Sequence, residues 1–194
     1  YKLTSVDFAN GSQLTSIGFD AFHYCNTLAT VTNIPTSTHI GYAAFPNLTT
    51  LTQVTFQNSS QSDLAGSIDT LAFKNCTALT SINIPSNSLA ITPYDISGEY
   101  AFHNCTLLTS ITIPASTNIG MNAFRWSGTA NNKLTSVTFN SNAEANFILN
   151  TGINDHPSSI GDNAFYQCTV LTTITIPVNV TSIGERAFYN NYLL

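Results

Sequence analysis

The chain contains few charged residues. Five of its 194 residues are Lys or Arg and ten are Asp or Glu, which gives a charged fraction of 8% and a formal net charge of −5. An average soluble domain has about 25% charged residues. Nucleic-acid binding needs clustered cations that replace counterions on phosphate, and here the cations are scattered, so we expect no nucleic-acid partner. A surface of Ser, Thr and Asn in place of charge favours an extracellular location.

Long apolar runs are also missing. No stretch approaches the roughly 20 apolar residues that cross a bilayer, so we expect no membrane insertion of this segment. No signal peptide is visible, and the chain does not begin with Met.

Motifs of catalysis and cofactor binding are absent as well. The chain has no G-x-S-x-G, no H-E-x-x-H, no Gly-rich phosphate loop and no close pair of carboxylates. The adjacent Asp155 and His156 have no identifiable nucleophile. His23 and His103 share one position in the pattern described below, which suggests a solvated face. We therefore expect no catalytic residue and no cofactor, and the favoured interpretation is that the chain is not an enzyme.

Four cysteines remain to be explained. Cys25, Cys76, Cys105 and Cys168 are separated by 51, 29 and 63 residues, which matches no zinc-binding spacing. We expect no metal site and interpret the four side chains as buried free thiols that act as small apolar groups. A disulfide between Cys76 and Cys105 remains open, although parallel Cβ vectors in neighbouring repeats disfavour it.

The positive feature of the chain is a repeat marked by the pair Ala-Phe. Seven such pairs end at Phe22, Phe45, Phe73, Phe102, Phe124, Phe165 and Phe188, at intervals of 23, 28, 29, 22, 41 and 23 residues. An Ile nearly always stands five residues before the Phe, and a Gly usually follows that Ile. A base period of about 23 residues with insertions predicts a repeat solenoid, in which each unit buries its apolar face only against its neighbours.

Each unit contains one clear strand pattern, Leu-x-x-Val/Ile-x-Ile/Phe. It covers residues 3–8, 28–34, 51–56, 79–84, 108–113, 134–139 and 171–176, and Asn33 is an extra residue that suggests a bulge. The x-x-Ala-Phe-x-x-Cys segment is short enough for one or two helical or 3₁₀ turns. The predicted fold class is a curved parallel β-sheet of about seven strands, with short helical or 3₁₀ turns on the other side and a continuous spine of Phe side chains.

This pattern resembles the BspA-like leucine-rich repeats, whose unit reads approximately L-x-x-I-x-I-P-x-x-V-x-x-I-G-x-x-A-F-x-x-C-x-x. The best matches are residues 171–194 and 3–28. The resemblance implies a solenoid with its sheet on the concave side, and a surface or secreted protein linked with adhesion. We expect residues 1–194 to form a single solenoid of about seven repeats, as a segment of a longer chain. Departures from the pattern are Leu48, Ser127 and Asn191 at the Cys position and Ser97 at the Ile position, which suggest local loosening.

The candidate binding residues lie first on the sheet. The third and fifth strand positions should point outward, and they are almost entirely hydroxyl-bearing or amide side chains. The candidates are Thr30, Thr32, Gln53, Thr55, Asn83, Thr112, Thr138, Thr173 and Thr175. One interpretation is a recognition surface for protein or glycan. The other is a neutral surface in which Thr is simply a good strand former.

Further candidates lie at the insertions, which in solenoids map to loops and often to a binding face. Residues 140–159 carry the largest insertion and include Phe147 in an apolar trio, which either contacts a partner or folds back onto the solenoid. Arg125 and Trp126 adjoin another insertion. One interpretation is a pair of interface anchors, for which Trp and Arg are favoured, and the other is a Trp that covers a gap at an irregular repeat.

The leading functional hypothesis is a non-enzymatic extracellular module that binds a protein or a glycan, on another cell or in the extracellular matrix, in adhesion. The alternative is a structural brick of a filament, coat or stalk that self-associates through uncapped solenoid ends.

Overall fold

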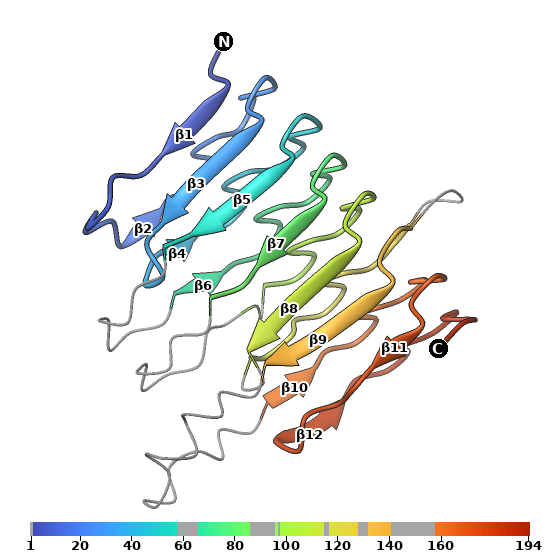
Figure 1. Cartoon of the computed structure of the whole chain (residues 1–194). Coiled ribbons are helices and arrows are strands. Elements are labelled where there is room, and N and C mark those ends of the chain that lie inside the picture. The colour runs from blue at the N-terminus through green and yellow to red at the C-terminus, as the bar shows by residue number, and fades with distance from the viewer. Residues whose placement is uncertain are drawn as a thin grey trace, which may run out of the picture.

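The computed structural model describes residues 2–57, 66–85, 96, 98–114, 117–127, 132–140 and 158–194. Parallel strands lie side by side in one layer, and shorter strands form a second layer behind them (Figure 1). No helix occurs in these described ranges. The architecture is therefore that of a β-solenoid, in agreement with the predicted fold class.

The larger sheet has seven parallel strands in the order β1-β3-β5-β7-β8-β9-β11. They are β1 (Ser5–Asp7), β3 (Thr30–Ile34), β5 (Gln53–Phe56), β7 (Ser81–Asn83), β8 (Ser110–Pro114), β9 (Ser136–Asn140) and β11 (Thr173–Ile174). Equivalent positions pair throughout, as in Ser81 with Ser110 and Ile82 with Ile111. The expected bulge is confirmed, because the register shifts between Val31 and Ile34 and Asn33 has a φ of 60°.

The second layer follows the Ile positions of the repeat. The strands β2 (Ser16–Ile17), β4 (His39–Ile40) and β6 (Ser67–Ile68) form one parallel sheet, and β10 (Ser158–Ile160) pairs with β12 (Val180–Ile183). Between them, Ile119 bridges Ile96 on one side and Ile160 on the other. Ile96 is fully buried and thus occupies the position for which the sequence pattern pointed to Ser97. The expected loosening at this Ile position does not occur, because the chain shifts by one residue.

At Gly161, which follows Ile160, glycine is required by the close approach of the neighbouring repeat. A Cβ atom on Gly161 would lie 2.7 Å from the carbonyl carbon of Gly120 and 2.9 Å from the carbonyl oxygen of Ile119. Contacts this short are not tolerated by real side chains, so a larger residue would push the two repeats apart.

The Ala-Phe segments form a third ladder. The amide of each Phe donates to the carbonyl of the Ala in the next repeat, from Phe22 on Ala44 to Phe165 on Ala187, at 2.8–2.9 Å. The expected helical turns are replaced by consecutive hydrogen-bonded turns. The reason is that left-handed residues interrupt them two positions before the Phe in every repeat, and two positions after it in all but one, as at Asp20 and Tyr24. A helix cannot continue through such residues.

The predicted Phe spine is confirmed. Consecutive rings stack from Phe22 to Phe188 with centroids 4.7–5.4 Å apart and interplanar angles of 1–7°. The central rings are almost completely buried, with Phe45, Phe73 and Phe165 at 0% exposure. Each ring therefore supplies the apolar surface that its neighbour covers, and this spine together with the Leu, Val and Ile of the two layers forms the core.

The cysteine column has a hydrogen-bonding role. All four cysteines are free thiols. The thiols of Cys76, Cys105 and Cys168 donate to the Phe carbonyl of the preceding repeat, at 3.1, 3.3 and 3.6 Å. In the last repeat the Nδ2 of Asn191 donates to the equivalent carbonyl of Phe165 at 3.1 Å, so this departure from the pattern preserves the bond. Burial raises the pKa of the Cys76 and Cys168 thiols to about 12, which keeps them protonated.

Candidate functional site

The outward side of the seven-stranded sheet carries two polar rows, which we call the sheet-face rows. The first row contains the third strand positions, Ser5, Thr30, Gln53, Ser81, Ser110, Ser136 and Thr173. The second row contains the fifth positions, Asp7, Thr32, Thr55, Asn83, Thr112, Thr138 and Thr175. The residues between the rows point inward, and Val31, Val54, Ile82, Ile111 and Val137 are all buried. The nine sheet candidates from the sequence therefore occupy one surface.

Most of these side chains have no partner among the residues that the structure describes. In the described part of the chain, the hydroxyls and amides of Thr30, Gln53, Asn83, Thr112, Thr138, Thr173 and Thr175 make no hydrogen bond. Two candidates differ. The hydroxyl of Thr32 donates to Asp7 at 2.6 Å, and the hydroxyl oxygen of Thr55 accepts from the Asn33 amide at 3.2 Å.

The threonine hydroxyls directly before five of these strands make different contacts. The pre-strand threonines Thr52, Thr80, Thr109, Thr135 and Thr172 each donate their hydroxyl to the backbone carbonyl of the preceding repeat, at 3.1–3.4 Å. Their backbone amides donate to the same carbonyls. These threonines join neighbouring repeats, whereas the sheet-face rows remain available to solvent.

The one carboxylate in the rows lies at the N-terminal edge. Asp7 accepts hydrogen bonds from Thr32 and, at 2.7 Å, from the Nδ2 of Asn33. These two bonds stabilise the ionised form and lower the pKa of the Asp7 carboxyl. The bulge thus turns the Asn33 side chain toward Asp7. From the sequence, Asn33 was recognisable only as an extra residue in the strand.

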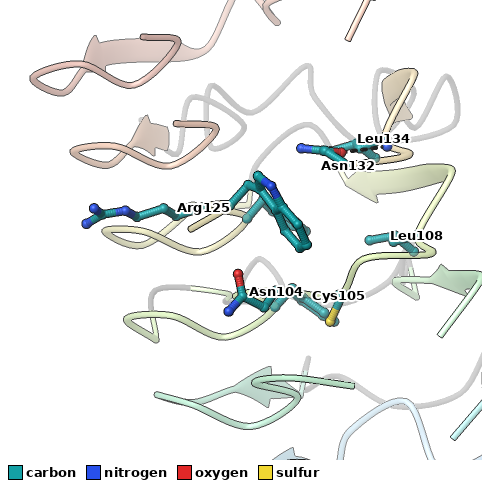
Figure 2. A pocket seen from close by; sticks show the side chains of 9 residues that line it. Asn104, Cys105, Leu108, Arg125, Asn132 and Leu134 are labelled. Carbon is teal, nitrogen blue, oxygen red and sulfur yellow. Dashed lines mark hydrogen bonds between the residues drawn. The ribbon is translucent and has the colours of Figure 1, made fainter. Parts of the chain in front are cut away.

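Arg125 and Trp126 lie beside a small notch that is open to solvent (Figure 2). Its lining comes from neighbouring repeats and includes Cys105 and Leu108 from one and Leu134 from the next. Trp126 lines the notch, but the Arg125 guanidinium extends away from Asn132 and Leu134. It lies 4.9 Å from the centre of the Tyr166 ring and donates to Asn122 at 3.1 Å. The two predicted anchors therefore do not converge. Phe147 lies outside the described residues.

His103 corrects one expectation from the sequence. It is 8% exposed, so it does not lie on a solvated face. Its Nδ1 has no hydrogen-bond partner among the described residues. Burial, together with the positive charges of Lys74 and Arg125, lowers the pKa of His103 to about 4. The side chain is therefore neutral at physiological pH.

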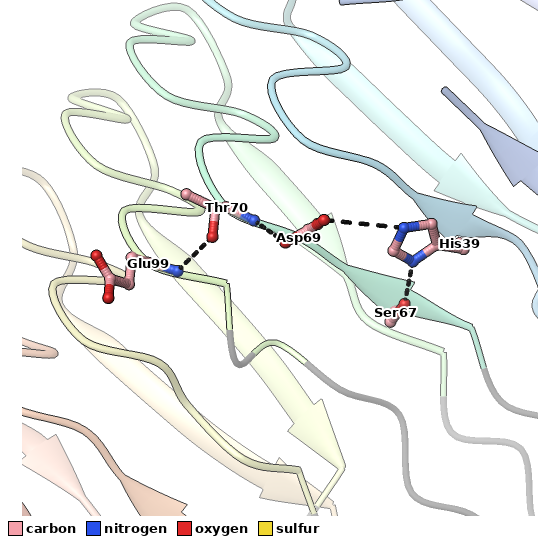
Figure 3. A network of polar contacts seen from close by, with 5 residues as sticks. All are labelled: His39, Ser67, Asp69, Thr70 and Glu99. Carbon is pink, nitrogen blue, oxygen red and sulfur yellow. Dashed lines mark hydrogen bonds and ion pairs between the residues drawn. The ribbon is translucent and has the colours of Figure 1, made fainter. Parts of the chain in front are cut away.

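A polar cluster that sequence reasoning missed lies on the second layer (Figure 3). His39 contacts the Ser67 hydroxyl through Nδ1, and its Nε2 lies 3.9 Å from Asp69. The three residue types are those of a catalytic triad, but 3.9 Å is too long for the hydrogen bond that orients the base. The His and Asp side chains are 49% and 43% exposed, and an exposed pair of this kind contributes little stability. The cluster was missed because its members come from different repeats.

Two further observations concern the described ranges. They contain no group of three or more His, Cys, Asp or Glu side chains arranged to hold a metal ion. They also contain no helix with the length and hydropathy needed to cross a bilayer.

The stacked parallel repeats, the Phe spine and the polar sheet face define a leucine-rich-repeat solenoid. The family model of the BspA type leucine-rich repeat region matches residues 1–128, 60–154 and 144–194. The chain therefore belongs to the BspA-type leucine-rich repeat family, as the sequence pattern indicated.

Solved structures agree with this assignment. A leucine-rich cell surface protein from Faecalibacterium prausnitzii is 28% identical with a TM-score of 0.70; the match covers 100% of this chain and 47% of that protein. The chain thus spans about half of the length of that relative. The leucine-rich repeat protein TpLRR from T. pallidum is 23% identical with a TM-score of 0.67, covering 100% of this chain and 79% of that one, and it supports the fold alone. No curated protein matches the chain.

Proposed function

We propose that this protein is a non-enzymatic binding module of the extracellular space or the cell surface, which contacts its partner through the sheet-face rows. The observation that carries the proposal is the array of hydroxyls and amides on seven neighbouring strands, most of which make no hydrogen bond within the described ranges. Polar groups of this kind elsewhere in the same repeats are used to join one repeat to the next. The cell-surface location of the Faecalibacterium relative and the usual role of leucine-rich repeats in binding support this function.

The test is a binding assay with purified protein on cells and on surfaces coated with matrix proteins or glycans. The variant Gln53→Arg/Ser110→Arg places two bulky charges on β5 and β8, both at exposed positions of the first row. The control variant Ser16→Arg/Ser182→Arg places the same charges at exposed positions of the second layer, on β2 and β12. We expect saturable attachment that the first variant abolishes and the control preserves. Equal attachment by both variants, or none by the parent protein, would overturn the proposal.

Self-association is a second candidate, favoured by the apolar side chains around the last repeat. Val178, Ile183, Tyr192, Leu193 and Leu194 are 106%, 51%, 74%, 59% and 51% exposed. A further repeat, from the same chain or from another copy, would cover them. Light scattering across a concentration series distinguishes this function, because a monodisperse monomer at high concentration contradicts a self-assembling brick.

A further inference from the structure

The spacing of the sheet-face rows is regular. Neighbouring strands of a sheet lie about 4.8 Å apart, so each row presents one polar side chain at each such step. The rows run across the strands, along the direction in which the repeats stack (Figure 1). A ligand that uses several positions of a row must therefore extend along the stack and repeat its own chemistry at a similar interval.

The chemistry of the rows limits the ligand further. Neither row contains Lys, Arg or an aromatic residue, and Asp7 at the first strand is the single charge. Without cations the surface cannot compensate an anionic polymer. Protein interfaces depend on Trp, Tyr and Arg anchors, and Ser and Thr are under-represented among such anchors. The rows therefore suit neither an acidic polymer nor a typical protein epitope.

Hydroxyl groups can both donate and accept hydrogen bonds, and they rotate to suit the partner. The row side chains are free to do so, because within the described residues only Asp7, Thr32 and Thr55 are engaged. The partner that matches an array of this kind is itself rich in hydroxyls, uncharged, unbranched and periodic.

We infer that the sheet-face rows bind a neutral, linear polysaccharide that lies across the strands, with successive sugar units over successive strands. One hexose in an extended β-linked glycan is similar in length to the step between strands. This inference rests on the proposed function and names the chemical class of the partner for the same surface. Each sugar unit gains only a few hydrogen bonds, so useful affinity requires that many units bind together.

The first experiment measures affinity by calorimetry for β-linked gluco-oligosaccharides and chito-oligosaccharides, from disaccharide to octasaccharide. We expect Kd to fall by about threefold for each added unit, until the oligomer reaches the length of the sheet. Sulfated and uronic-acid oligosaccharides of equal length, and branched mannan, serve as comparison ligands and should bind at least tenfold more weakly.

The second experiment tests the site with matched variants. Thr112→Val/Thr138→Val removes the hydroxyls of two residues that are opposite each other in the register of β8 and β9, and it keeps the side-chain shape. Thr15→Val removes an exposed hydroxyl from outside the seven-stranded sheet. We expect the double variant to weaken oligosaccharide binding about tenfold and the control to leave Kd unchanged, with circular dichroism confirming that both variants remain folded.

The outcomes separate this inference from the proposed function. If neutral oligosaccharides do not bind, or bind without length dependence, the inference is wrong. If protein-coated surfaces still capture the protein in that case and Gln53→Arg/Ser110→Arg blocks the capture, the proposed function stands with a protein partner. Preference for the acidic oligosaccharides also overturns the inference, since the rows have no cation to explain it.

Discussion

The pre-strand threonines lie one position before the first sheet-face row and three before the second, yet the polar groups of the threonines and of the rows have different contacts. The hydroxyl of Thr109 donates to the carbonyl of Thr80, whereas the hydroxyls of Thr112 and Thr138 have no partner in the described part of the chain. A strand turns successive side chains to opposite faces, and the pre-strand residue precedes this alternation. The comparison teaches that similar residue types either bond neighbouring repeats together or stay exposed without a partner among the described residues, depending on their position relative to the strand.

Substitutions in the Phe spine should change the free energy of unfolding more than substitutions on the surface. Phe73 is fully buried and its ring lies 5.3 Å from both neighbouring rings. We expect Phe73→Ala to destabilise the protein by about 3–5 kcal/mol, since it removes a buried ring and opens a cavity between two others. Urea unfolding followed by circular dichroism measures the change. Phe19, which is 69% exposed, is the matched control, and Phe19→Ala should alter the midpoint little. Similar losses for both variants would contradict the spine as the main source of stability.

The buried His103 should make stability dependent on pH. Its pKa is about 4 in the folded protein and about 6.5 when unfolded, so the unfolded chain binds more protons between these values. Stability is therefore retained above pH 6.5 and falls as the pH is lowered toward 4, by as much as about 3 kcal/mol from this group. His103→Leu should remove this part of the acid dependence. Midpoints of thermal unfolding at a series of pH values provide the measurement, and identical pH profiles for the two proteins would contradict the assignment.

The side chain of Asn104, two residues after Phe102, should have an intermediate effect on stability. The Nδ2 of Asn104 donates to Asn75 at 3.2 Å, and its Oδ1 accepts two bonds from Ser127 at 3.1 Å. Asn104 also has a φ of 58°, which Ala tolerates poorly and Gly tolerates well. We expect Asn104→Ala to cost about 2 kcal/mol and Asn104→Gly about 1 kcal/mol, because the second variant loses the hydrogen bonds without the backbone strain. Equal losses in denaturant unfolding would show that the backbone conformation contributes nothing.

Much of this architecture could be predicted from the sequence, because the repeat itself carries the information. The register of Phe22 to Phe188 predicted the stacked spine, and the alternation in each strand predicted which side chains face outward. The turn conformation was not predictable in the same way. Asp20, Ala43 and Leu71 adopt left-handed backbone at one shared position, and of these only Asp commonly does so. The ladder hydrogen bonds of the neighbouring repeats impose this conformation.

The cluster of His39, Ser67 and Asp69 and the burial of His103 depend on contacts between repeats, which the spacing of a single unit does not reveal. The direction of the Arg125 guanidinium was not predictable either, because it depends on Tyr166 in the next repeat. Regular positions were predictable because every repeat shares them, and irregular ones were not.

The smallest expected effect bears directly on the comparison between the two kinds of threonine. Thr109→Val removes a hydroxyl that bonds the preceding repeat and should cost about 1 kcal/mol. Thr138→Val removes an unpartnered hydroxyl on an exposed strand position and should change stability by less than about 0.5 kcal/mol, since Val is an equally good strand former. Urea unfolding of the two variants and the parent protein measures both. A larger loss for Thr138→Val would mean that the sheet-face rows stabilise the stack themselves, and the proposed difference in role between the rows and the pre-strand threonines would then be wrong.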